Sequence, residues 1–161
     1  MITQKAAYKI TLVILTLLVT SCKNEPFSIE EEQNKILAQH NAQRVYHFEK
    51  DSIAFANQLS DNFISVNRGV ISKPEKEATI SRYHGYFSSV KFIKWDDVTP
   101  PIIKFSDDGS LAYTIVDKIV TVSYEDKDGN IKTGETHFAW TAIYKKYGDD
   151  WKVEAVTSTN K

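Results

Sequence analysis

Two different spacings of apolar residues divide the chain. Over residues 30–48 apolar positions recur at helical spacing, which predicts an amphipathic helix whose leading glutamates suit its positive N-terminal end. Asp51 or Ser52 is placed to cap a short second helix. Ser72-Lys73-Pro74-Glu75 matches a capping box that would open a third helix. The core face of this third helix would carry Ile80, Tyr83, His84 and Phe87.

Elsewhere the spacing changes to two, which is typical of strands. The predicted strands cover residues 63–67, 90–98, 102–105, 111–124, 132–146 and 151–158. Arg68-Gly69 and the Asp- and Gly-containing segments between the later strands are predicted turns. Helices followed by an antiparallel meander indicate an α+β domain, with the N-terminal helices packed on one face of a curved antiparallel sheet.

The N-terminus has the pattern of an export signal. Lys5 and Lys9 precede residues 10–19, which contain no charge, glycine or proline. A bilayer span needs roughly 20 residues, so this shorter run favours a secretory signal peptide over a transmembrane helix. The run ends in Val19-Thr20-Ser21-Cys22, which resembles a bacterial lipobox, in which the cysteine is lipidated. The alternative is an ordinary signal peptide followed by a free thiol.

These features predict the organisation and location of the protein. Residues 1–21 would be a lipoprotein signal peptide, residues 22–29 a tether, and residues 30–161 a single folded domain. Acyl chains on Cys22 would anchor the domain stably to a membrane of the bacterial cell envelope. We expect this membrane to be the outer membrane, with the domain on its periplasmic side.

Composition excludes several classes of function. Lys and Arg total 20 against 21 Asp and Glu, so the chain has no strong basic field with which to bind nucleic acid. The single cysteine allows neither an internal disulfide nor a cysteine-rich zinc site. No glycine-rich phosphate loop or nucleophile elbow is present.

The spacing of the histidines along the sequence does not match that of a metal site. His40 and His47 are seven residues apart on the first predicted helix, which separates them by about 10 Å. His84 and His137 have no visible ligand partner. Residues 126–130 superficially resemble a calcium loop, but the glycine position and the missing ligand glutamate favour a hairpin turn. We therefore expect no metal and no other cofactor.

The order of elements resembles the nuclear transport factor 2-like superfamily, which includes ketosteroid isomerase and the SnoaL-like polyketide cyclases. The resemblance covers residues 36–158. Its most specific parts are residues 59–67, Trp140-Thr141 and residues 148–153. It implies a cone-shaped sheet with the N-terminal helices on its concave face. This fold serves isomerases, cyclases, dehydratases, binding proteins and scaffolds, so it does not by itself assign a function.

The catalytic residues of ketosteroid isomerase do not carry over. By the resemblance, the general-base aspartate corresponds to Asn67, which cannot accept a proton at neutral pH. The oxyanion tyrosine corresponds to Gln43, and the protonated oxyanion aspartate falls near Trp140 or Thr141. The resemblance therefore argues against ketosteroid isomerase chemistry in this chain.

Asp117 and Lys118 place two charges inside an apolar strand. Because strand side chains alternate, one of the two must point to each face of the sheet. An acid in an apolar pocket would have a raised pKa and could exchange protons with a substrate. The alternative is a charge at the open end of the cone or one that is paired across the sheet.

The sequence thus favours a lipid-anchored protein that binds a small apolar or aromatic molecule without catalysis. One alternative is an isomerase, cyclase or dehydratase that uses Asp117 as acid or base, and another is a homodimeric interaction module. Aromatic rings such as Trp140 would line the cavity. The candidate ligand-binding residues are Asn67, Tyr83, Tyr113, Asp117, His137 and Thr141.

Overall fold

The computed structural model describes residues 28–161. The predicted signal peptide, Cys22 and most of the predicted tether lie outside these residues. The first helix, α2 (Ile29–Glu49), begins one residue before the predicted start of the domain. Ser28 caps it, because the backbone N–H of Glu31 donates to the Ser28 side chain over 3.3 Å. Among residues 28–161, no helix is long and apolar enough to cross a membrane.

Two further helices follow. Helix α3 (Ser52–Asn57) is capped by Asp51, as predicted. Helix α4 (Lys76–Ser89) begins after Pro74, but the predicted capping box is wrong. Ser72 pairs with Ser65 in the sheet and ends a short strand, so its side chain is not at the helix N-terminus. His84 is exposed, whereas Phe87 on the same helix is fully buried.

Of the seven strands, four extend beyond their predicted bounds, the strand predicted at residues 90–98 is one residue shorter at each end, the strand at 102–105 has its predicted bounds, and the strand at 70–72 was not predicted. They are β1 (Leu59–Asn67), β2 (Val70–Ser72), β3 (Lys91–Asp97), β4 (Ile102–Phe105), β5 (Leu111–Glu125), β6 (Ile131–Tyr147) and β7 (Asp150–Asn160). The sheet order is β2-β1-β7-β6-β5-β3, and β4 also pairs with β5. The sheet is mixed rather than wholly antiparallel, because β1 runs parallel to β7. The chain reaches β3 from β2 through α4, so β3 lies at the opposite edge of the sheet from β2.

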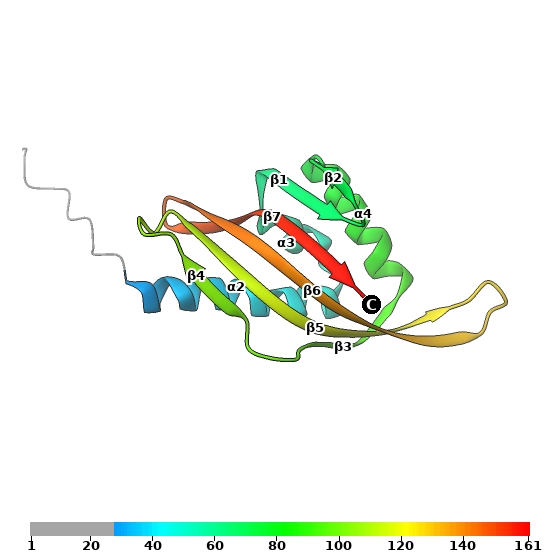
Figure 1. Cartoon of the computed structure of the whole chain (residues 1–161). Helices are drawn as coiled ribbons and strands as arrows, with labels where there is room; N and C mark the ends of the chain where they lie inside the picture. Colours follow the sequence, from blue (N-terminus) through cyan, green and yellow to red (C-terminus); the bar gives the residue numbers. More distant parts are fainter. Residues whose placement is uncertain (1–27) are drawn as a thin grey trace, which may run out of the picture.

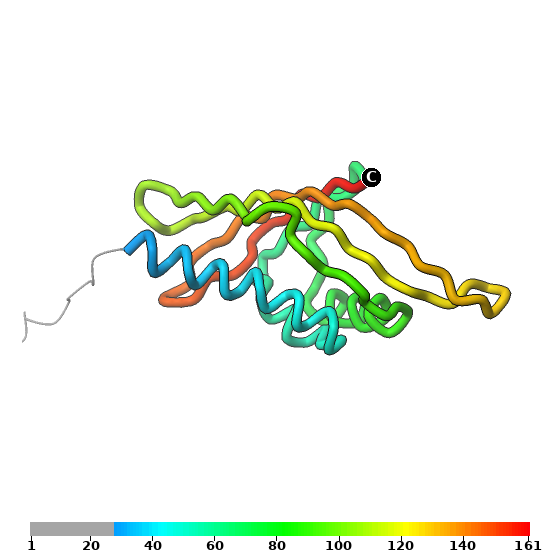
Figure 2. Tube along the Cα trace, turned by 90° about the horizontal axis from the view of Figure 1, so that it is seen from below, coloured from blue at the N-terminus to red at the C-terminus, as the bar shows by residue number. Residues whose placement is uncertain are grey.

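The sheet is curved and open, and the helices lie against one of its faces (Figures 1 and 2). We call this the inner face and the opposite one the outer face. The predicted α+β fold with N-terminal helices is confirmed. The β5–β6 hairpin extends beyond the rest of the sheet (Figure 1).

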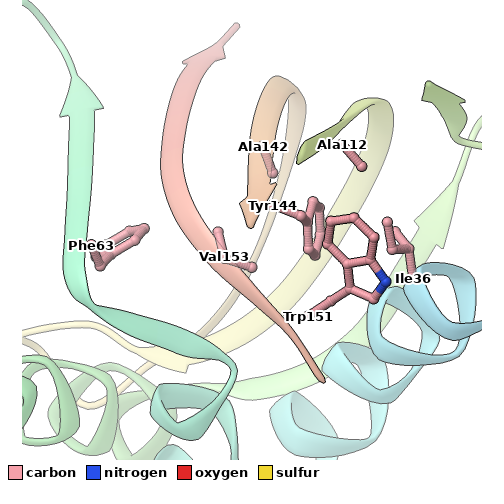
Figure 3. Packing of buried hydrophobic residues seen from close by; sticks show 7 residues of the cluster. All are labelled: Ile36, Phe63, Ala112, Ala142, Tyr144, Trp151 and Val153. Atoms are coloured by element: carbon pink, nitrogen blue, oxygen red, sulfur yellow. The ribbon is translucent and has the colours of Figure 1, made fainter. Parts of the chain in front are cut away.

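Two apolar clusters fill the space between helices and sheet. The first joins α2 to the centre of the sheet (Figure 3) and contains Ile36, Phe63, Ala112, Ala142, Tyr144, Trp151 and Val153. The second joins α3 and α4 to β3 and β5 and contains Phe55, Phe87, Phe92, Trp95 and Val120. Phe63, Phe87 and Val153 are buried between helix and sheet. Phe87 was predicted on the core face of its helix together with Ile80, which is half-buried.

A buried glutamate fastens the start of α2 to the sheet. The indole Nε1 of Trp151 donates to Glu32 over 2.6 Å, and Lys146 and Lys35 place their Nζ atoms 2.9 Å and 3.0 Å from the same carboxylate. Burial alone would raise the pKa of Glu32, but the hydrogen bonds from Lys146, Lys35 and Trp151 lower it to about 2. Glu32 is therefore ionised at neutral pH.

Candidate functional site

A cavity of about 430 Å³ lies between the helices and the inner face of the sheet. Helices α2, α3 and α4, together with strands β1, β3, β6 and β7, contribute to its walls. Its lining is mostly apolar and aromatic and comprises Gln43, His47, Phe55, Leu59, Phe63, Ser65, Asn67, Arg82, Tyr83, Tyr86, Trp95, Phe138, Trp140, Ala142, Val153, Val156 and Ser158. This volume lies in the range typical of small-molecule sites.

Strand alternation and register place the polar side chains of this lining. Ser65 and Asn67 share a face of β1, because residues two apart point the same way. In the register of the sheet, Asn67 pairs with Ser158, and Ser158 pairs with Trp140. Asn67, Ser158 and Trp140 therefore form one row across three strands. Ser65 lies in the row beside it, next to Val156.

One wall of the cavity is a stack of aromatic rings centred on His47. Its imidazole stacks on Trp95 with a centroid separation of 3.5 Å and meets Phe55 edge-on at 5.3 Å. The His47 Nδ1 donates to the backbone carbonyl of Gln43 over 2.6 Å. Burial lowers the pKa of His47 to about 4. His47 is therefore neutral at pH 7 and has its lone pair on Nε2.

Behind this aromatic wall lies a buried charged cluster of His40, Asp97 and Lys118. The Lys118 Nζ is 2.7 Å from one Asp97 oxygen, and the His40 Nε2 is 2.9 Å from the other. Only 2% of the His40 side chain and 3% of the Lys118 side chain are exposed. Burial lowers the pKa of both His40 and Lys118, against the opposing effect of the nearby Asp97.

The charged cluster supports the cavity without lining it. The Lys118 Nζ lies 5.3 Å from the ring centroid of Trp95 and 5.9 Å from that of Trp140, which is within the range of cation–π attraction. Both tryptophans line the cavity, whereas the three members of the charged cluster do not. We infer that His40, Asp97 and Lys118 position the tryptophan wall and do not touch a molecule in the cavity.

The candidate residues from the sequence divide between the two faces of the sheet. Asn67 and Tyr83 line the cavity. Tyr113, Asp117, His137 and Thr141 lie on the outer face, so the prediction that they line the cavity is wrong. The reason is the strand period: the inward positions of β5 are its even-numbered residues, including Val116 and Lys118. On the outer face, His137 and Asp117 pair with each other.

Of the four positions named through the family resemblance, three lie at the cavity. Asn67, Gln43 and Trp140 all line the cavity, although they lie far apart in the sequence. Thr141, the other position named for the oxyanion acid, points outward. Three positions named through the resemblance thus lie around one cavity, although they lack the residue types of the isomerase.

Several residues of the site were not predicted. Ser65 and Ser158 lie in strands that the sequence predicted. The alternation of side chains along these strands was the signal that could have placed them on the inner face. Asp97 was missed because its contact with Lys118 depends on the pairing of β3 with β5, in which the two residues lie directly opposite each other. Arg82 precedes the predicted Tyr83 on α4, and nothing in the sequence pattern singled it out.

Within residues 28–161, no cluster of three or more His, Cys, Asp or Glu side chains is arranged to hold a metal ion. The outer-face pair of Asp117 and His137 supplies only two such groups. The cavity lining supplies one, His47, whose Nδ1 already donates to a carbonyl.

Comparison with known proteins gives similarity in structure and not in sequence. No family model matches the sequence, and no curated protein matches it. An NTF2-like protein from Cytophaga hutchinsonii matches the structure with a TM-score of 0.63 at 18% identity, covering 80% of this chain and 98% of its own. A ketosteroid isomerase-like protein from Erwinia carotovora atroseptica matches with a TM-score of 0.61 at 16% identity, covering 81% and 96%.

An enzyme is among the similar structures. A hexachlorocyclohexane dehydrochlorinase of the LinA type 2 form matches with a TM-score of 0.65 at 12% identity, covering 81% of this chain and 86% of its own. Identities this low establish the fold and leave the activity open. The curved sheet, the helices on its inner face and these matches together show that the chain has the cone-shaped fold of the nuclear transport factor 2-like superfamily.

Proposed function

We propose that the protein binds a small apolar or aromatic molecule in the cavity between its helices and sheet. The observation that carries this proposal is a cavity of about 430 Å³ walled by the rings of Phe55, Tyr83, Trp95, Phe138 and Trp140. Burying an apolar ligand against such rings gains free energy in proportion to the area removed from water. Rigid aromatic side chains lose little conformational entropy when a ligand binds.

The chemistry of the lining favours binding over acid–base catalysis. Among the described residues that line the cavity there is no aspartate or glutamate. Asp117, the acid considered from the sequence, lies on the outer face in contact with His137. An acid or base is what an isomerase, cyclase or dehydratase needs next to its substrate.

A second candidate is an enzyme that uses His47 as its base. The neutral ring lines the cavity and has its lone pair on Nε2. The structural similarity to a dehydrochlorinase makes proton abstraction from a small apolar substrate the reaction to consider. However, a pKa of about 4 makes His47 a weak base, so we rank this candidate below simple binding.

The anchoring proposal rests on the sequence alone. We propose that Cys22 is lipidated and holds the domain at a membrane of the cell envelope, with the outer membrane, periplasmic side, as the expected location. Mass spectrometry of the mature N-terminal peptide from membrane fractions tests this proposal. An unmodified Cys22 would contradict it.

The partner we propose is a second copy of the chain, docked through the outer face. Tyr113 and Ile143 lie directly opposite each other on β5 and β6, and each is 42% exposed. Leu111 and Ile115 extend the same apolar surface along β5. Light scattering of the purified domain, compared with the Ile115→Glu variant, tests this proposal. A wild-type protein that is monomeric at all concentrations would contradict it.

Filling the cavity tests the binding proposal. The neutral fluorescent dye anilinonaphthalene should bind the wild-type domain, and Ala142→Leu, which adds bulk to the lining, should weaken binding by about tenfold or more. Ala139→Leu is the matched control, because it makes the same change on the outer face of the same strand. Thermal unfolding must show that both variants are folded, since overpacking costs about 1–3 kcal/mol. Absence of dye binding to the wild type, or equal binding by all three proteins, would overturn the proposal.

A further inference from the structure

The cavity carries a single formal charge. Among its described lining residues, Arg82 is the one side chain that is charged at neutral pH, because His47 is neutral and no carboxylate is present. The nearby Lys118 lies behind the rings of Trp95 and Trp140 and is paired with Asp97. The cavity therefore presents one positive charge and no negative charge to a bound molecule.

The guanidinium of Arg82 contacts a ring of the cavity but has no counter-ion among residues 28–161. Its Cζ lies 4.9 Å from the ring centroid of Tyr83, which also lines the cavity. It forms no ion pair with any of residues 28–161. Arg44, the comparable arginine on α2, does pair with a carboxylate, that of Asp96. The Arg82 guanidinium thus packs against the Tyr83 ring, and none of its hydrogen-bond donors binds another of residues 28–161.

Neutral donors accompany Arg82 in the same cavity. The side chains of Ser65, Asn67 and Ser158 line the sheet side of the cavity and make no hydrogen bond to another described residue. Arg82 and Asn67 are also exposed, so they mark where the cavity opens to solvent. The inner part of the lining, by contrast, is formed by buried rings such as Phe55 and Trp95.

We propose that the ligand of the cavity is an apolar acid, whose rings or chain pack against the tryptophan wall and whose carboxylate or sulfonate binds Arg82 at the mouth. This inference rests on the proposed function of the cavity as a binding site. A guanidinium presents a planar fork of N–H donors that matches the two oxygens of such an anion. Asn67 and Ser158 would donate to the same group and fix its orientation.

Two dyes that differ by one charged group test this inference. Anilinonaphthalene is neutral, whereas anilinonaphthalene sulfonate has the same rings and an anionic group. We expect the sulfonate to bind the wild-type domain about tenfold more tightly than the neutral dye, as a charge-assisted hydrogen bond to a partly exposed arginine implies. Added NaCl should reduce the preference, because salt screens charges near the surface.

Arginine variants locate the effect. Arg82→Gln should abolish the preference for the sulfonate over the neutral dye, measured as the ratio of the two affinities, and Arg82→Lys should retain part of that preference. Arg44→Gln is the control, because it removes the same charge from a residue outside the cavity lining. If both dyes bind equally, or if Arg82→Gln keeps the preference, the inference of an acidic ligand is overturned while the proposed binding function stands. If neither dye binds, the binding proposal itself fails.

Discussion

The same kinds of charged side chain lie on both faces of the β5–β6 ribbon, but they are buried on the inner face and exposed on the outer face. Lys118 and Asp117 are neighbours in sequence, yet Lys118 is 3% exposed in a buried cluster and Asp117 is 41% exposed in an outer pair. His40 supplies the imidazole on the inner side, and His137 supplies it on the outer side. Each face thus has an Asp–His contact, but only in the inner contact is the imidazole removed from water. Burial, and not the identity of the partners, decides what each contact contributes.

The largest difference in stability between the two faces should appear when an aromatic side chain is removed from each. Phe87 of α4 is 0% exposed in the core on the inner side of the sheet, whereas Tyr113 on the outer face is 42% exposed. Phe87→Ala should lower the free energy of unfolding by about 3–5 kcal/mol, because it leaves a cavity in the core. Tyr113→Ala should cost about 0.5 kcal/mol in the monomer, where this position is solvent-exposed, so both variants are measured at concentrations at which the domain is monomeric. Urea unfolding measures both, and a loss below about 1 kcal/mol for Phe87→Ala would contradict the packing described above.

The neighbouring charges sharpen the comparison within one strand. Lys118→Met keeps the apolar stem but leaves Asp97 without its closest cation, and it should cost about 3 kcal/mol. Asp117→Asn removes one member of a half-exposed pair and should cost less than about 1 kcal/mol. Chemical denaturation of the two variants gives the difference directly. Equal losses would mean that the inner cluster is as well solvated as the outer pair.

Acid should destabilise the inner face. Burial depresses the pKa of His47 from 6.5 to about 4, so between these values the unfolded chain binds a proton that the folded protein excludes. Stability is therefore complete above pH 6.5 and falls as the pH drops towards 4, by about 2 kcal/mol between pH 7 and pH 5 from this residue. His40 acts in the same direction, because burial lowers its pKa too.

The variant His47→Gln isolates this effect. The variant should be less stable at pH 7, since the stacked ring is lost, but its stability should depend less steeply on pH between 7 and 5. Thermal unfolding across this range provides the slope. A slope identical to that of the wild type would show that His47 does not titrate differently on folding.

The sequence was most informative where a single local pattern decides the structure. The alternation of residues 111–124 predicted a strand that the structure extends by one residue, to Glu125. The same alternation required Asp117 and Lys118 to face opposite ways, but it did not say which of them faces inward. That choice depends on which face of the sheet the helices cover. The partner of Lys118, Asp97, is set by the pairing register of β3 with β5, which the alternation within a single strand does not reveal.

The other errors also arose from long-range pairing. Ser72 and Glu75 match the local chemistry of a capping box, but pairing of Ser72 with Ser65 in the sheet overrode it. The parallel pairing of β1 with β7 joins segments from opposite ends of the domain and was likewise not predicted. The cavity residues show the same limit. Asn67 and Tyr83 were predicted from the sequence. The row that joins Asn67 to Ser158 and Trp140 was not, because it depends on two strand registers at once.

The contact between Glu32 and Trp151 has a consequence for biosynthesis. The two side chains are 119 residues apart in sequence, so the first helix meets this partner only after nearly the whole domain has been synthesised. Contacts of such high sequence separation form slowly, because a long loop must close first. A nascent chain therefore leaves the ribosome before this contact can form, whereas contacts of α2 that are closer in sequence, such as that of Gln39 with Gln58, can form earlier.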